Sequence, residues 1–151
     1  MSDKVEVRQA EIRDIPYIKE LLLQLYNTIS NNEGLDQMMI EHNLAKVFSD
    51  EHSILIAEKQ GSIVGMIYVI YHQSLLHYGL SACIEELVVH KGFRGQGIGK
   101  LLVEKGVEMA HEKGCVELEV STEFTNKEAI SFYEKFGFKQ IGVLLEMELD
   151  S

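Results

Sequence analysis

One stretch, LVVHKGFRGQGIGK at 87–100, constrains the fold of this 151-residue chain more than any other. Its apolar start predicts a strand, and its end opens a helical pattern of apolar residues. Between them stand three glycines within five residues, Gly95, Gly97 and Gly99. Glycine adopts positive φ at little steric cost, so such a turn can aim consecutive backbone N–H groups at a ligand. With the positive end of the following helix, these donors predict an anion site suited to phosphates, whereas the simpler alternative is a tight strand–helix turn.

The charge of this stretch supports a phosphate ligand. The chain has 14 Lys and Arg against 24 Asp and Glu, a formal net charge of −10. From 90 to 105, however, four basic residues oppose only Glu104, a local charge of +3. The acidic remainder disfavours nucleic acid and anionic membrane as partners and suits a cationic substrate, although an acidic balance also aids solubility. The basic residues are Lys91, Arg94, Lys100 and Lys105.

The spacing excludes two common nucleotide-binding loops. A Walker A loop needs Gly at position 94 and Ser or Thr at position 101, where Arg94 and Leu101 stand. A dinucleotide-binding fingerprint needs Gly at position 100 or 102, and neither is present.

Hydrophobic periodicity predicts the other elements. Strands are expected at 5–8, 53–58, 63–71, 82–89 and 116–120, helices at 14–26, 35–48, 97–113 and 127–136, a loop at 30–34, and one or two closing strands at 138–149. The short connection at 59–62 predicts an antiparallel pair, and the strand–helix–strand unit around the glycines predicts a parallel pair. The chain is therefore expected to form one α/β (α+β) domain over 1–151, with a mixed, mostly antiparallel central sheet flanked by helices.

Several classes of protein are not expected. No apolar run approaches the about 18 residues of a membrane span, and the polar start is unlike a signal peptide, so a cytoplasmic protein is expected. Cys83 and Cys115 have apolar neighbours, which indicates buried structural thiols and no disulfide framework. The six histidines fit no zinc spacing, so no metal is expected.

Two blocks resemble one known family. The run from Arg94 to Gly99, RGQGIG, is similar to the Gln/Arg-x-x-Gly-x-Gly/Ala signature of the GNAT family of N-acetyltransferases, which bind acetyl-CoA. The run from Asn126 to Phe138 matches every position of the family's downstream pattern N-x-x-A-x-x-F-Y-x-K-x-G-F. The order of elements also agrees from about Val5 onward. The resemblance implies the GNAT fold and acetyl-CoA as co-substrate, but it is nearly silent about the acceptor.

The resemblance also implies binding roles. Backbone groups of Leu87, Val88 and Val89 would pair with the pantetheine arm of the cofactor, as a strand edge pairs with a peptide. In this family the strand that holds them splays from the next strand, here 116–120, and the cofactor enters that gap. The loop would hold the pyrophosphate through Arg94, Gly95, Gln96, Gly97, Ile98, Gly99 and Lys100.

The downstream block would complete the cofactor site. By resemblance, Asn126 would hydrogen-bond the pantetheine, Phe132 would pack near it, and Tyr133 would protonate the departing thiolate. A phenol of pKa about 10 is a weaker acid than a thiol of about 8.5, so Tyr133 is expected to act mainly by hydrogen-bonding the developing charge. The alternative is an ordinary tyrosine of an amphipathic helix.

Acetyl transfer to an amine also needs a proton acceptor. An amine of pKa about 10.4 is protonated at pH 7 and must lose a proton before it attacks a thioester. Glu85 and Glu86 directly precede Leu87, and strict alternation would place Glu85 on the face of Leu87 and Val89. We expect Glu85 to be the base or to hold a water, and Glu86 to contact substrate. The alternative is a solvated pair of charges.

The sequence thus predicts an acetyl-CoA-dependent N-acetyltransferase that works by direct attack in a ternary complex. The acidic balance favours a small cationic acceptor, such as a polyamine, an amino sugar or a peptide N-terminus. Neither Cys83 nor Cys115 lies in a nucleophile setting, so no acyl-enzyme is expected. The rival prediction is a non-catalytic acyl-CoA-binding sensor or regulatory module. A homodimer is possible, but no sequence feature identifies its interface.

Overall fold

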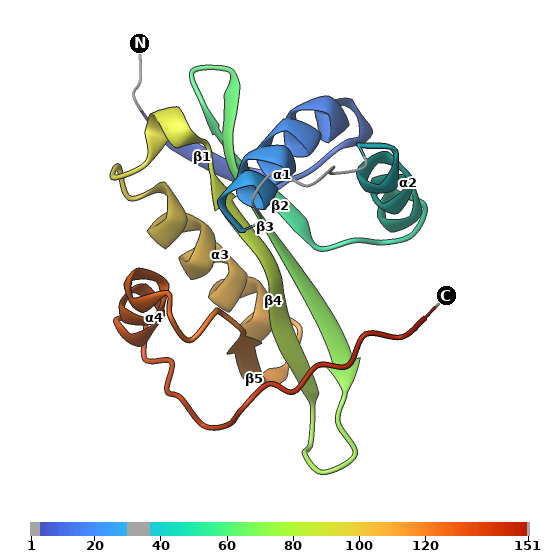
Figure 1. Ribbon diagram of the computed structural model, residues 1–151, viewed down its shortest axis with the longest axis vertical. Helices are drawn as coiled ribbons and strands as arrows, with labels where there is room; N and C mark the ends of the chain where they lie inside the picture. The colour runs from blue at the N-terminus through green and yellow to red at the C-terminus, as the bar shows by residue number, and fades with distance from the viewer. Residues whose placement is uncertain (1–3, 30–36, 151) are drawn as a thin grey trace.

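The computed structural model describes residues 4–29 and 37–150 (Figure 1). Its strands are β1 (Val5–Gln9), β2 (Ile54–Lys59), β3 (Ser62–Gln73), β4 (Leu80–Val89) and β5 (Cys115–Val120). Its α-helices are α1 (Ile15–Ile29), α2 (Gln37–Phe48), α3 (Ile98–Glu112) and α4 (Lys127–Glu134), with short 3₁₀ turns η1 (Ile12–Asp14) and η2 (Lys91–Phe93). Each of these strands and α-helices lies where periodicity predicts one, with ends that differ by a few residues. The predicted loop at 30–34 lies outside the described residues.

The strands form one sheet in the order β1-β2-β3-β4-β5. The first three pairings are antiparallel, and β4 pairs with β5 in parallel. The structure therefore confirms the predicted α/β fold with a mixed, mostly antiparallel sheet. It also confirms the antiparallel β2–β3 pair and the parallel pair on either side of α3.

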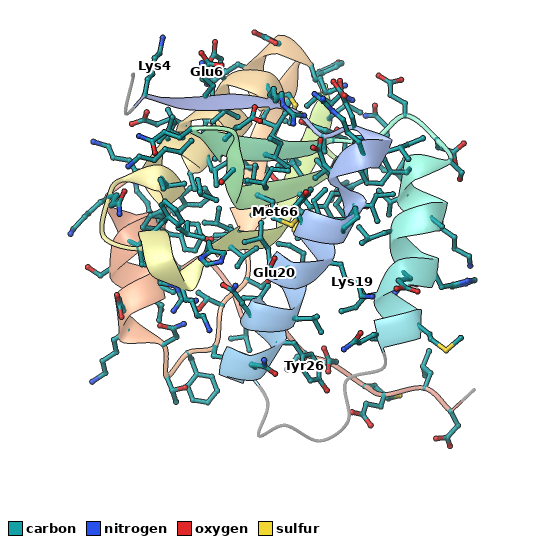
Figure 2. The ribbon with its side chains drawn as sticks, turned by 90° about the horizontal axis from the view of Figure 1, so that it is seen from above. Lys4, Glu6, Lys19, Glu20, Tyr26 and Met66 are labelled. Atoms are coloured by element: carbon teal, nitrogen blue, oxygen red, sulfur yellow. The ribbon has the colours of Figure 1, made fainter. Side chains whose placement is uncertain are left out.

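Helices cover both faces of the sheet. One hydrophobic cluster packs α1 and α2 against one face, and β3 contributes Met66, which lies beneath α1 (Figure 2). The other cluster packs α3 and Tyr133 of α4 against the opposite face, where β3 contributes Ile67. An ion pair between Lys19 of α1 and Glu41 of α2 joins the two helices of the first layer. The alternation of β3 thus supplies both layers from one strand.

The pairing between β4 and β5 stops halfway along β4. β5 pairs with β4 only from Leu80 to Ile84, whereas β3 pairs with β4 over its full length to Val89. From Glu85 to Val89, one edge of β4 therefore faces no strand within the described part of the chain. This agrees with the splay that the family resemblance implies.

A β-bulge lies at the start of this open edge. Tyr68 of β3 pairs with Glu86, but the next residue, Val69, pairs with Ile84, so Glu85 is the extra residue. Ile84 and Leu87 both pack on the α3 side of the sheet although they are three positions apart. The prediction that strict alternation carries through Glu85 to Leu87 and Val89 was therefore wrong. Glu86 instead shares the α1–α2 face with its cross-strand neighbour Tyr68 and with Val88.

The predicted closing strands are absent. Residues 138–150 form neither helix nor strand, and they lead away from α4 toward a distant C-terminus (Figure 1). A strand needs a neighbouring ladder to satisfy its backbone groups, and this segment runs along no described strand of its own chain. The alternating apolar pattern is present in this segment, but among the described residues no neighbouring strand pairs with it. Among the described residues, no helix is both long and apolar enough to cross a membrane.

Candidate active site

The glycine loop between β4 and α3 has the geometry of an anion cradle. Gly95 and Gly97 have φ of 78° and 80°, in the left-handed region that favours glycine. Apart from each glycine and its neighbours along the chain, no atom lies within 4 Å of where a Cβ would stand at either position, so the backbone conformation, not packing, requires glycine there. Gly97 is the N-cap of α3 and makes no side-chain cap, which leaves the first N–H groups of the helix available. These features fit a phosphate group.

Residues far away in sequence hold this loop. The Lys91 backbone N–H donates to Oε1 of Gln24 on α1 at 2.9 Å. The Lys59 ammonium donates to Oε1 of Gln96 at 2.8 Å, from the end of β2. Sequence reasoning missed Gln24 and Lys59, because no local pattern shows that α1 and β2 reach the loop.

The open edge of β4 presents two sets of backbone groups. The His90 N–H donates to the Val64 carbonyl of β3 at 2.8 Å. Because hydrogen-bonded and non-hydrogen-bonded pairs alternate along an antiparallel ladder, the backbone groups of Leu87 and Val89 point away from β3. Those of Val88 point toward β3, and its side chain is buried on the α1–α2 face. Val88 thus has no backbone group at the open edge, contrary to the prediction from the whole Leu87–Val89 run.

Arg94 lies beside this edge rather than only in the loop. Its Nε donates to the carbonyl of Val89 at 3.3 Å, the last residue of β4. This weak bond covers one of the acceptors that the open edge offers, and Leu87 retains its own groups.

Helix α4 brings the downstream residues to the loop. A Cβ placed on Gly99 would lie 3.6 Å from both the Phe132 ring and the Val89 side chain, so these three residues meet. Asn126 lies at the N-cap of α4, where its Oδ1 accepts from the Ala129 N–H at 3.1 Å. Its amide nitrogen can still donate to a ligand.

Tyr133 sits in an aromatic cluster on the α3 side of the sheet. Its ring centroid lies 5.1 Å from that of Phe132 and 5.5 Å from that of Phe138, both edge to face. Burial raises the pKa of Tyr133 to about 12. The phenol is therefore protonated across the physiological range and can act only as a hydrogen-bond donor or a neutral acceptor.

The two carboxylates at the bulge differ in their surroundings. Glu85 is exposed, whereas Glu86 is half-buried on the α1–α2 face. Burial raises the pKa of Glu86 above its ordinary value, and the negative charge of Glu85 adds to that rise. The Glu85 charge also contributes to the raised pKa of Tyr68, whose main cause is burial. The fold has therefore raised the proton affinity of the Glu86 carboxylate.

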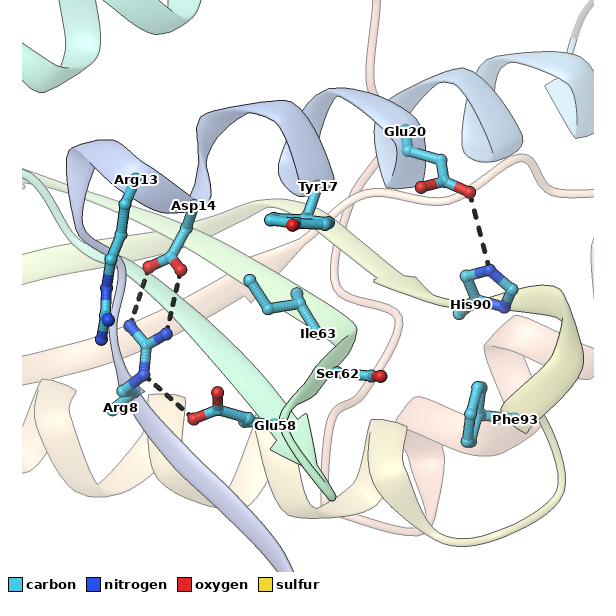
Figure 3. Close-up of a pocket in the computed structure, with 11 residues that line it drawn as sticks. Arg8, Arg13, Asp14, Tyr17, Glu20, Glu58, Ser62, Ile63, His90 and Phe93 are labelled. Atoms are coloured by element: carbon cyan, nitrogen blue, oxygen red, sulfur yellow. Dashed lines mark hydrogen bonds and ion pairs between the residues drawn. The ribbon is translucent and has the colours of Figure 1, made fainter.

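Two cavities lie on the α1–α2 side. The larger, of about 580 Å³, opens between β1, α1 and η2 (Figure 3). In it Arg8 donates to both oxygens of Asp14 at 2.7 and 2.9 Å, and it also pairs with Glu58. His90 faces Glu20 across 3.9 Å. The described residues that line it include neither Tyr133 nor the bulge carboxylates, so this cavity is not centred on the predicted chemistry.

The smaller cavity is closer to the bulge. Its volume is about 340 Å³, and Tyr68, the cross-strand partner of Glu86, lies in its wall. Asp50 and Glu51 add two negative charges to the lining, and Lys46 adds one positive charge. The sequence alone gave no reason to select Tyr68 over the other tyrosines.

Comparison with known proteins agrees with this geometry. The sequence model of the acetyltransferase (GNAT) family matches residues 17–138. N-alpha-acetyltransferase MAK3 of Arabidopsis thaliana is 30% identical over 91% of this chain and 72% of its own length. Aminoalkylphosphonate N-acetyltransferase of Salmonella typhimurium is 32% identical over 89% and 85%. A crystal structure of a transcriptional regulator from Bacillus halodurans is 28% identical, with a TM-score of 0.84 over 97% of this chain and all of its own.

The chain belongs to the GNAT family of acetyltransferases. The splayed sheet, the glycine loop and the downstream α4 are therefore parts of an acetyl-CoA-dependent N-acetyltransferase fold. Within residues 4–29 and 37–150, no group of three or more His, Cys, Asp or Glu side chains is placed to hold a metal ion.

We predict that Gly97→Ala weakens acetyl-CoA binding about tenfold. A residue with a Cβ in the left-handed region costs about 1–2 kcal/mol, and relaxing that strain would turn the loop N–H groups away from the phosphates. Calorimetric titration with acetyl-CoA measures the change. Gly92→Ala is the matched control, because its Cβ would meet His90 at an ordinary 3.4 Å and its φ is not positive. Equal affinities for both variants would show that the loop conformation does not matter for binding.

Proposed function

We propose that this chain transfers the acetyl group of acetyl-CoA to a primary amine of a small, cationic acceptor by direct attack in a ternary complex. The observation that carries the proposal is the open edge of β4. This edge connects the glycine loop with two chemically distinct faces of the sheet. Glu86 lies on the α1–α2 face, and Tyr133 lies on the α3–α4 face.

The residues of the open edge and loop would bind the cofactor, which supplies an acetyl thioester. The backbone groups of Leu87 and Val89 that point away from β3 can pair with an amide-containing chain as a β-strand would. The N–H groups from Gly95 to Lys100 can hold negatively charged phosphates at the start of α3. Arg94 would exchange its bond to Val89 for the ligand, and Asn126 and Phe132 would close the site from α4.

On the α1–α2 face, Glu86 would accept the amine proton, directly or through a water. A general base works best when its pKa approaches the working pH, and burial moves the pKa of Glu86 in that direction. This modifies the expectation from alternation, which favoured Glu85 as the base. Glu85 would then keep the pKa of Glu86 raised and attract a cationic acceptor.

On the opposite face, Tyr133 would stabilise the departing thiolate. Its hydroxyl stays protonated because its pKa is raised to about 12. Full transfer of its proton to a thiolate is therefore uphill, so the role is hydrogen bonding to the developing negative charge. Because Glu86 and Tyr133 lie on opposite faces, the proton acceptor and the hydrogen-bond donor do not bond each other.

The acceptor is inferred from charge and from the smaller cavity. Asp50, Glu51 and Tyr68 offer carboxylates and an aromatic face, which suit an ammonium group. The relatives allow more than one acceptor class, since one is named for aminoalkylphosphonate and another for N-alpha-acetylation. The strongly acidic chain and the acidic lining favour a small polyamine-like or amino-sugar acceptor.

A non-catalytic sensor of acyl-CoA is the second candidate, and the regulator named among the similar structures favours it. A sensor needs the glycine loop and the open edge but needs neither a raised-pKa carboxylate nor a buried tyrosine beside them. This chain has both, which supports the enzyme.

The direct test is release of free CoA thiol from acetyl-CoA across a panel of polyamines, aminoglycosides, amino sugars, amino acids and short peptides. We expect turnover confined to one class of small cationic amine. Turnover with peptides alone would overturn the acceptor assignment. No turnover, together with a rise in melting temperature on adding acetyl-CoA, would favour the sensor.

We predict that Tyr133→Phe lowers kcat about 10²-fold and leaves acetyl-CoA affinity within about twofold, because only one transition-state hydrogen bond is lost. Steady-state kinetics with the best amine, together with calorimetry, separates the two effects. Tyr78→Phe is the matched control, since Tyr78 is almost fully exposed on the β3–β4 hairpin. An unchanged kcat for Tyr133→Phe would remove this residue from the mechanism.

We predict that Glu86→Gln lowers kcat/KM by about 10²-fold or more. A protonated Glu86 cannot accept a proton, so wild-type kcat/KM should fall as the pH drops through the raised pKa of Glu86. This acidic limb of the pH profile should vanish in the Glu86→Gln variant. Glu85→Gln removes the neighbouring negative charge and lowers the pKa of Glu86, so it should move the limb to lower pH without abolishing activity. The opposite pattern, with the limb lost in Glu85→Gln, would assign the base to Glu85.

A further inference from the structure

The glycine loop has little packing of its own to hold it. Six of the seven residues from Lys91 to Gly97 are exposed, and only Phe93 is half-buried. Glycines in such a loop give the unbound backbone many alternative conformations. Fixing the backbone in one of them costs conformational entropy, so a loop that is ordered before the ligand arrives binds it more tightly. Groups outside the loop that hold its conformation therefore affect the affinity of the site.

The loop begins with the 3₁₀ turn η2, and each of the three backbone N–H groups of this turn has an acceptor. The Gly92 N–H donates to Nδ1 of His90 at 3.0 Å, and the Phe93 N–H donates to the His90 carbonyl at 2.8 Å. These two bonds are local. The third group, the Lys91 N–H, donates instead to Oε1 of Gln24 at 2.9 Å. Gln24 thus completes the hydrogen bonding of η2 from a helix 67 residues earlier in the sequence.

The helix that carries Gln24 is itself fixed in place. Ile18 and Leu21 of α1 are almost completely buried in the core on the α1–α2 face of the sheet. Glu20 lies one turn before Gln24, on the same side of the helix, and it faces Nε2 of His90 across 3.9 Å (Figure 3). Two side chains from one side of α1 therefore meet the first residues of the loop.

A second contact reaches the loop from the sheet, but it holds the loop in a different way. The Lys59 ammonium at the end of β2 donates to Oε1 of Gln96 at 2.8 Å and lies 6.0 Å from the centre of the Phe93 ring. Both of these partners are side chains, which can move while the loop backbone stays where it is. Gln24 instead bonds a backbone N–H group, so its contact fixes the course of the main chain.

We propose that Gln24 is a positioning residue for acetyl-CoA. Its bond to Lys91 holds the start of the loop, so that the N–H groups from Gly95 to Lys100 are in place before the phosphates arrive. Gln24 acts through the loop backbone and makes the affinity for the cofactor depend on α1, a helix of the opposite layer from α3. This inference rests on the proposed role of the loop in binding phosphates.

The test compares two substitutions of Gln24 by calorimetric titration with acetyl-CoA. Gln24→Leu removes the acceptor and should weaken binding about fivefold, as expected for one hydrogen bond between neutral groups. Gln24→Glu keeps an oxygen acceptor and should restore the affinity to within about twofold of wild type. Gln9→Leu is the matched control, because it also removes a bond from a glutamine side chain to the backbone, here to the His52 carbonyl, at the opposite end of β2 from Lys59. This control should leave the affinity unchanged.

A fragment of the cofactor separates loop positioning from a general loss of structure. S-acetylpantetheine has the thioester and the pantetheine arm but no pyrophosphate, so it cannot use the N–H groups of the loop. With the best amine of the panel, Gln24→Leu should lower kcat/KM about fivefold for acetyl-CoA and leave kcat/KM for S-acetylpantetheine unchanged. An equal loss with both substrates would overturn the proposal.

The binding data also distinguish two kinds of failure. If Gly97→Ala weakens acetyl-CoA binding and Gln24→Leu does not, the loop binds the cofactor but Gln24 does not position it. If neither variant weakens binding, the phosphate-binding role of the loop is wrong, and the role of Gln24 is wrong with it.

Discussion

The site depends on one constraint, the early end of the pairing between β4 and β5. β3 holds β4 in the sheet as far as Val89, but β5 follows it only to Ile84. The backbone groups of Leu87 and Val89 are therefore fixed in direction, and yet no strand among the described residues pairs with them. Unpaired backbone groups beside a hydrophobic core are costly, so this edge is suited to a ligand that can complete the ladder. The glycine loop lies at the end of the same strand, where it can hold the charged end of that ligand.

The bulge at Glu85 determines how the two faces of this edge are used. Without it, Ile84 and Leu87 could not both face α3, and Glu86 would not share the α1–α2 face with Tyr68. One inserted residue thus buries a carboxylate on one side while Leu87 stays packed on the other. Burial raises both the pKa of Glu86 and the pKa of Tyr133, with opposite chemical consequences. The Glu86 carboxylate becomes a stronger base, and the Tyr133 hydroxyl stays protonated as a hydrogen-bond donor.

Periodicity and turn chemistry predict most of this architecture, because each helix and strand carries its own amphipathic pattern. The glycine loop is predictable for the same reason: positive φ at Gly95 and Gly97 is a local requirement. The bulge is not predictable, since it depends on which β3 residues lie opposite β4. Gln24 reaches the loop only through tertiary packing, so it has no signal in the sequence. In residues 139–150 the pattern of a strand is clear, but such a pattern cannot show that a neighbouring strand is placed to pair with it.

The charge distribution can be understood from the same geometry. At physiological ionic strength the screening length is about 8 Å, so a ligand in the site responds to nearby charges more than to the net −10. Phosphates at the start of α3 would meet the local +3 of the 90–105 stretch, while a cation approaching from the α1–α2 face would meet the carboxylates around Glu86 and the smaller cavity. The sheet lies between these two regions, and the open edge of β4 connects them. A fold that separates an anionic cofactor from a cationic acceptor in this way can bind both at once, as direct transfer requires.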